Sequence, residues 1–227
     1  MTLLITILPS LALVLYFVKS DKFKEPNRII IITFLFGILI TIPAGYLNSL
    51  IDKNFATGEI FNDALLSGFF GGGPVEELLK FSVLYFYILK EKAFNEPMDA
   101  LVYGVLASLG FATLENFQYV FYLDSEFWTA QEIAIFRSYS AIPLHGLCGT
   151  IMGFYFGQYA FSANKKYLGL AIIVPIIFHG SYNFMCDYNW YYAVSIVAVG
   201  FIFALLLHRN LKLLQKEKKK ENEEKKV

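Results

Sequence analysis

The stretch Gly71-Gly72-Gly73-Pro74-Val75-Glu76-Glu77-Leu78-Leu79-Lys80 decides the fold class predicted for this chain of 227 residues. It places two adjacent carboxylates and an ammonium group between two apolar segments, residues 64–70 and 81–89. At the centre of a membrane helix each such group costs roughly 2.5–3.5 kcal/mol. Ionisable groups inside a membrane therefore rarely face lipid, and the stretch predicts internal ion pairs, a polar cavity or chemistry.

The composition favours a membrane protein over a soluble domain. Hydrophobic residues make up 56% of the chain and charged residues only 17%, whereas soluble domains carry about 25% charged residues. The two cysteines, Cys148 and Cys186, have no CxxC or Cys/His spacing, so neither a disulfide framework nor a zinc finger is expected. The predicted fold is an all-α, polytopic membrane helix bundle.

Apolar stretches of about 20 residues are long enough to cross a bilayer as helices. We predict that the glycine run and Pro74 break the third such stretch. Residues 1–211 are predicted to form one integral membrane domain, and residues 212–227 a charged cytoplasmic tail. The sequence contains about seven such stretches, at residues 2–18, 29–50, 64–89, 98–122, 137–161, 167–185 and 189–208.

The basic residues predict the orientation. With seven crossings, all of the 19 Lys and Arg residues except Lys53, Lys80 and Arg137 fall on one side of the membrane. Loops rich in Lys and Arg stay in the cytoplasm, so the N-terminus is predicted outside and the C-terminus inside. Asp99 and Arg137 lie at the edges of spans and are predicted to be interfacial anchors.

Four ionisable positions on four different spans are predicted to share one depth. At about 1.5 Å per residue, Glu76, Glu115, His145 and His179 all fall in the outer half of the membrane. Scattered structural residues have no reason to agree in depth. The inner half of the spans contains few acidic residues, which favours an enzyme over a proton relay spread across the membrane.

The neighbours of these positions predict a packed polar pocket. Lys80 lies four residues after Glu76 and three after Glu77, so it can pair with either carboxylate. Asn183 lies four residues after His179, on the same helix face. Small residues allow two helices to approach closely. Such residues follow His145 at intervals of four: Gly149, Gly153 and Gly157.

Two imidazoles and one carboxylate form the ligand set of a catalytic zinc ion that retains an open position for water. We predict that Glu115, His145 and His179 bind Zn²⁺. A further glutamate would act as general base, with Glu76 preferred, Glu77 supporting it, and the order of the two left open. The supporting residues are predicted to be Lys80, Asn116 and Asn183.

Four motifs in order along the chain resemble those of the PrsW family of bacterial intramembrane proteases, which start the degradation of membrane-bound anti-sigma factors. The resemblance covers about residues 65–190 and extends to the CAAX prenyl endopeptidase and Abi membrane proteases. Those CAAX relatives have a histidine where this chain has Glu115, so prenyl-protein processing is not expected. The motifs are EELLK at residues 76–80, FATLEN at 111–116, His145 with its glycines, and HGSYN at 179–183.

The resemblance implies a multi-pass protein of the bacterial plasma membrane. It would cleave a membrane-anchored, anti-sigma-factor-like protein near the extracytoplasmic side, with water activated by a metal or by a glutamate. Its expected partners are this substrate and the lipid bilayer, with no nucleic acid. A proton- or ion-coupled transporter and a catalytically inactive scaffold of the same fold are the alternatives.

Overall fold

The computed structural model describes residues 1–123, 125 and 127–224, with side chains through Glu217 and at Lys219. Within these residues every regular element is helical, as predicted. The elements are α1 (Thr2–Ser20), α2 (Asn27–Phe55), α3 (Ile60–Leu66), a π-helical turn (Ser67–Gly72), α4 (Gly73–Phe86), a 3-10 turn (Ile88–Lys90), α5 (Pro97–Phe121), α6 (Ala130–Tyr139), α7 (Ala141–Ser162), α8 (Lys165–Asn189), a 3-10 turn (Trp190–Tyr192) and α9 (Ala193–Glu224).

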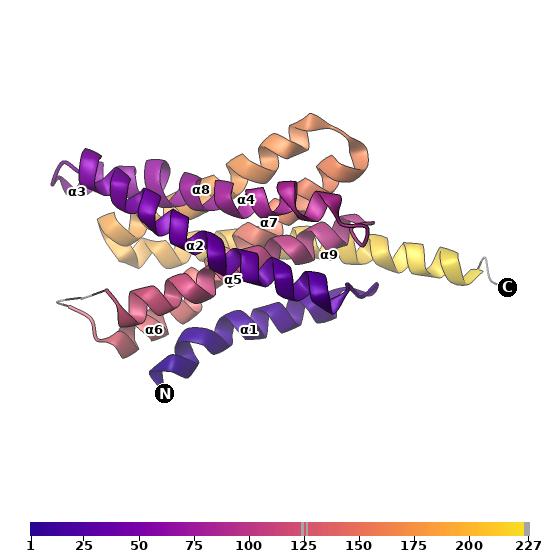
Figure 1. The fold of residues 1–227 in the computed structure, drawn as a ribbon, viewed down its shortest axis with the longest axis horizontal. Helices are drawn as coiled ribbons and strands as arrows, with labels where there is room; N and C mark the ends of the chain where they lie inside the picture. Colours follow the sequence, from indigo (N-terminus) through magenta and orange to yellow (C-terminus); the bar gives the residue numbers. More distant parts are fainter. Residues whose placement is uncertain (124, 126, 225–227) are drawn as a thin grey trace.

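Four helical stretches of the described chain are long and apolar enough to cross a membrane. They are Thr2–Ser20, Asn27–Phe55, Pro97–Phe121 and the stretch Lys165–Glu217, which contains α8 and α9 as far as Glu217. The start of α1 and the end of α9 lie toward opposite ends of the long axis of the bundle (Figure 1). An odd number of crossings requires this arrangement, but the seven crossings and their orientation stay predictions.

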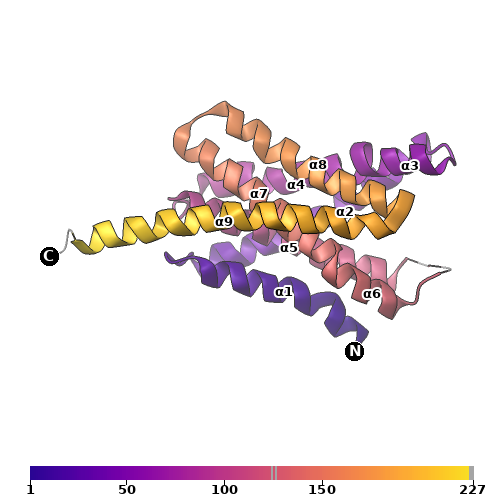
Figure 2. The ribbon, with the colours of Figure 1, turned by 180° about the vertical axis from the view of Figure 1, so that it is seen from behind.

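The central helix of the bundle is α5, which packs most extensively against α7 and then against α2 (Figures 1 and 2). Glycines bring α5 and α7 into backbone contact. A Cβ atom added at Gly153 would lie 2.4 Å from the carbonyl oxygen of Ala100, and one at Gly149 would lie 2.6 Å from that of Gly104. The predicted close contact along the small residues after His145 is thereby confirmed.

The helices α2 and α5 also touch through glycine. A Cβ atom at Gly37 would lie 2.1 Å from the carbonyl oxygen of Ala107. We expect Gly37→Ala to destabilise the bundle by about 1–3 kcal/mol, because overpacking forces two helix backbones apart. Thermal unfolding in detergent measures the effect. The matched control is Gly45→Ala on the same helix, where an added Cβ meets nothing within 4 Å; equal stability of the two variants would contradict the prediction.

The predicted break in the third apolar stretch is confirmed. Instead of one helix over residues 64–89, the chain forms α3, the π-helical turn and α4, and Gly71 has non-helical dihedral angles (φ −95°, ψ −108°). Pro74 lies at the start of α4, where the missing N–H costs little. The same segment packs tightly on α8, since a Cβ atom at Gly68 would lie 2.5 Å from the carbonyl oxygen of Gly180.

The last helix runs without a break through the start of the predicted tail. Helix α9 extends from Ala193 to Glu224 (Figure 2), and the side chains of Leu211 and Gln215 are buried. Gln215 contacts the end of α1 through Asp21. Gln215 thus joins the start of residues 212–227 to the end of α1, while the division of the chain at residue 212 stays a prediction.

Candidate active site

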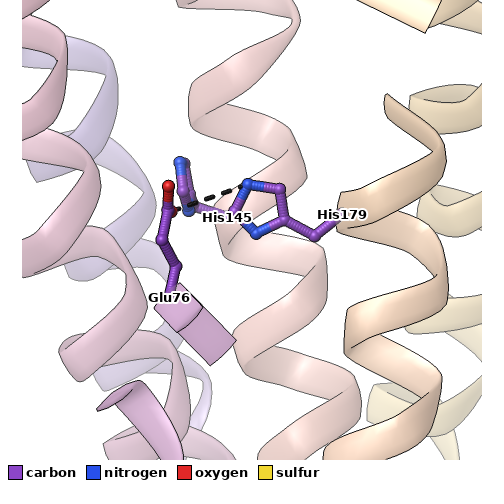
Figure 3. A group of neighbouring side chains, drawn as sticks. All are labelled: Glu76, His145 and His179. Atoms are coloured by element: carbon purple, nitrogen blue, oxygen red, sulfur yellow. Dashed lines mark ion pairs between the residues drawn. The ribbon is translucent and has the colours of Figure 1, made fainter. Parts of the chain in front are cut away.

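Three side chains from three helices converge in the interior of the bundle (Figure 3). Glu76 from α4, His145 from α7 and His179 from α8 each offer one donor atom, and these atoms lie within 4.8 Å of one another. All three residues are buried. The local break before α4 puts Glu76 in the first turn of that helix, where the helix dipole favours a carboxylate.

The ammonium group of Lys80 joins the carboxylates to the first imidazole. Its Nζ lies 2.8 Å from Oε1 of Glu77, 3.4 Å from Oε2 of Glu76 and 2.9 Å from Nδ1 of His145. The ring of Phe111 covers it at 4.2 Å. Lys80 is completely buried, and it contacts both glutamates, as its spacing in the sequence allows.

Glu77 orients the second imidazole. Oε1 of Glu77 accepts a hydrogen bond from Nδ1–H of His179 at 2.7 Å. The lone pair of Nε2 therefore lies on the other side of the ring. That Nε2 atom lies 3.6 Å from Oε2 of Glu76. Glu77 is fully buried, so its position is that of a supporting residue for His179.

The hydrogen bonds also fix the tautomer of His145. An ammonium group can only donate, so Nδ1 accepts from Lys80 and Nε2–H donates to Oε2 of Glu115 at 3.0 Å. Glu115 therefore lies next to His145, while the three residues whose donor atoms all lie within 4.8 Å of one another include Glu76 and not Glu115. The assignment of Glu115 as a metal ligand stays a prediction.

Arg137 corrects one interpretation of the sequence. It was expected at the membrane interface, yet its side chain is only 11% exposed and pairs with Glu115, Nη2 to Oε2, at 2.6 Å. Its Nε donates to Oδ1 of Asn116, and Asn116 donates in turn to the carbonyl oxygen of Thr6 in α1. The hydrogen bond to Asn116 thus fixes the position of the Arg137 guanidinium group, and the ion pair with Arg137 fixes the position of the Glu115 carboxylate.

The candidate site opens into a groove between α2 and α5. The cavity has a volume of about 1060 Å³. Among the residues that line it are Glu76 and Glu115, together with Asn48, Gly45 and Tyr119. The two glutamates are therefore the acidic members of the cluster that a molecule in the groove can reach, whereas Glu77 and Lys80 lie behind them.

Two contributors were not singled out from the sequence. Asn48 of α2 donates from Nδ2 to Oε1 of Glu76 at 3.4 Å, and Arg137 pairs with Glu115. Only the presence of a polar residue inside an apolar stretch signalled Asn48.

Asn183, predicted as a supporting residue, lies against the backbone at Gly72, where an added Cβ would be 2.3 Å from its Nδ2. It therefore packs beside the first turn of α4.

The donor set fits a metal ion. Two imidazoles and a carboxylate are the ligands of catalytic zinc, and the separation of 3.6 Å between Glu76 and His179 is close to the edge of about 3.4 Å expected for a tetrahedron with bonds of about 2.1 Å. Three carboxylates face two cations, Lys80 and Arg137, which leaves a negative charge for a metal to balance. A metal bond to His145 would replace one of its two hydrogen bonds.

Comparisons with known proteins match most of the chain. Residues 25–208 match the model of a family described as PrsW family intramembrane metalloprotease. The chain is 37% identical to Protease PrsW of Bacillus subtilis (strain 168) over 193 residues, which are 82% of this chain and 84% of that protein. It is 32% identical to Protease PrsW of Clostridioides difficile (strain 630) over 223 residues, 95% and 92% of the two chains.

No solved structure matches this chain. The family match covers most of the sequence and all the helices that carry the candidate site. The relatives likewise cover most of both chains at more than 30% identity. The chain therefore belongs to the PrsW family of intramembrane proteases.

Proposed function

We propose that this protease hydrolyses a peptide bond of a membrane-anchored protein that lies in the groove between α2 and α5. One observation carries the proposal: Glu76 belongs both to the buried cluster with His145 and His179 and to the wall of the groove. A peptide in the groove can thus reach the cluster from the side, between two helices that are apolar enough to cross a membrane.

We propose that Glu76, His145 and His179 hold a metal ion, with zinc favoured by the donor set. When bound, the metal would supply a water of lowered pKa and polarise the peptide carbonyl. Glu77 keeps the Nδ1 proton of His179 in place, so that Nε2 presents its lone pair toward Glu76. Lys80 holds Glu77 and Glu76 in position.

Glu115 is the proposed general base. It lines the groove, and its ion pair with Arg137 keeps it in the carboxylate form that accepts a proton. The attacking water gives one proton to Glu115 as its oxygen bonds to the carbonyl carbon. Glu115 then passes this proton to the amide nitrogen as the C–N bond breaks. The amide of Asn48, beside Glu76, is a donor for the carbonyl oxygen.

The proposed substrate is an anti-sigma-factor-like protein with a single membrane span, cut near the extracytoplasmic side. The charge distribution of the sequence supports this side of the membrane. In the structure the cluster lies in the half of the bundle near the N-terminus, since Asn116 bonds Thr6. The purified chain in liposomes should cleave such single-span proteins, and metal removal by a chelator should stop the reaction. A full panel of single-span proteins left intact would oppose the proposal.

A substitution in the groove tests where the peptide binds. Gly45→Leu should lower cleavage by at least about tenfold, because a leucine side chain at this position occupies space in the groove, and its cost to folding is small where nothing lies within 4 Å. The matched control is Gly169→Leu in α8, also open within 4 Å but outside the groove. Cleavage assays on both variants at equal thermal stability decide the matter; unimpaired Gly45→Leu would place the peptide elsewhere.

A further inference from the structure

A second group of acidic side chains, two of them buried, lies far from the candidate active site. Asp21 follows α1, Glu25 precedes α2, and Asp99 lies in the first turn of α5; each offers an oxygen within 4.8 Å of the other two. Along α5, Asp99 and Glu115 are about 24 Å apart at 1.5 Å per residue. Asp99 is completely buried and Asp21 is 2% exposed, which corrects the interpretation of Asp99 as an interfacial anchor.

Two of these carboxylates have an oxygen that nothing in the described structure satisfies. Oδ2 of Asp99 accepts the backbone N–H groups of Asn95 and Glu96 at 2.8 and 2.9 Å, but its Oδ1 is buried without a hydrogen-bond partner. Oδ1 of Asp21 accepts from Phe23 and Gln215, and its Oδ2 is likewise buried without a partner. A buried anionic oxygen without a partner is strongly unfavourable.

No positively charged side chain in the described part of the chain forms an ion pair with Asp21, Glu25 or Asp99. Lys24 lies nearby, and its ammonium group binds the backbone carbonyl oxygens of Val18, Lys19 and Asp21 at the end of α1, not a carboxylate. Glu25 instead accepts a hydrogen bond from the hydroxyl of Tyr103. Carboxylate oxygens thus lie close together, which calls for a bound cation or a shared proton.

We propose that Asp21, Glu25 and Asp99 bind a hard divalent cation, Mg²⁺ or Ca²⁺. The donors are all oxygen atoms, which these ions prefer. Glu25 is only half-buried and gives the ion access from the surface. The ion would join the end of α1 to the start of α5, and through the bond between Gln215 and Asp21 it would also fix α9. This site is independent of the proposed proteolysis.

The test uses the full chain, purified in detergent and stripped of metal with a chelator. Ca²⁺ binding is measured by equilibrium dialysis, Mn²⁺ binding by electron paramagnetic resonance, and stability by thermal unfolding with and without Ca²⁺ or Mg²⁺. A His179→Ala background removes a proposed ligand of the other site. We expect saturable binding of about one ion per chain in that background, and a higher unfolding temperature when the ion is present.

Asp99→Asn, and Glu25→Gln should the first variant not fold, should weaken the binding at least about tenfold and remove the shift in unfolding temperature. The matched control is Glu217→Gln, an exposed carboxylate two residues after Gln215, which should bind as the parent does. Absence of saturable binding in the His179→Ala background would overturn the proposal. Stabilisation by Asp99→Asn without metal binding would also overturn it, in favour of a shared proton. None of these measurements depends on cleavage.

Discussion

Glu76→Gln is expected to abolish both cleavage and metal binding. The side chain keeps its size and its place on the groove wall, but the amide is a much poorer metal ligand than the carboxylate and cannot offset the charge of Lys80. Cleavage should fall by at least about 10³-fold, the middle of the range of about 10²–10⁴-fold for loss of a catalytic acid or base. Zinc content, measured by mass spectrometry after dialysis, should fall well below one ion per chain.

Glu115→Gln is the matched comparison, because it removes the other carboxylate that lines the groove. As the proposed base it should lose about 10²–10⁴-fold in kcat while it retains the metal. If Glu115 is instead the ligand and Glu76 the base, Glu115→Gln will lose the metal and Glu76→Gln will keep it. If both variants and the parent lack metal yet only the parent cleaves, the water is activated by glutamate alone, and the metal site is refuted.

Lys80→Met is expected to have the largest effect on stability. It removes the ammonium group that contacts Glu76 and Glu77 and leaves two carboxylates buried without that partner. Breaking one side of a buried ion pair costs about 3–5 kcal/mol. The unfolding free energy in detergent, measured by denaturant titration, should fall by that amount, while membrane insertion continues because methionine is apolar.

A second substitution should restore most of the loss. Lys80→Met/Glu77→Gln removes the surplus charge along with its partner, so the double variant should be more stable than Lys80→Met alone. It should remain inactive, since glutamine at position 77 no longer fixes His179 as a carboxylate does. Lys165→Met, at an exposed lysine at the start of α8, should change stability by less than about 0.5 kcal/mol. Equal stability of Lys80→Met and the parent would show that the cluster does not stabilise the fold.

The sequence predicts the helices and the members of the candidate site better than it predicts their pairing. Gly71 and Pro74 have local backbone preferences, so the break before α4 could be expected from the residues alone. The glycines after His145 repeat at the helical period, so the contact with α5 could be expected too. These features depend on one segment at a time.

Contacts between side chains of different helices depend on the rotation of each helix about its own axis. The sequence of a mostly apolar helix gives little indication of that rotation. Arg137 was placed at a span edge because its position in the sequence says nothing about Glu115, to which it binds. Asp99 was interpreted in the same way, although it is buried beside Asp21 and Glu25. Asp99, with Asp21 and Glu25 beside it, also weakens the expectation that the inner half of the spans contains few acidic residues. The contact of Gln215 with Asp21 could not be predicted from the sequence for the same reason.

The contact between α2 and α5 has a consequence for selectivity. The two helices touch at Gly37 and leave space between them farther along, from Thr41 to Lys53. They contact along one stretch of α2, where Cβ atoms added at Gly37 and Gly110 would meet the carbonyl oxygens of Ala107 and Phe34, and where Thr41 donates to the carbonyl oxygen of Phe111. A slight increase in the spacing of α2 and α5 at Gly37 would widen the groove farther along. A residue that touches no peptide can therefore determine how bulky a side chain the groove admits.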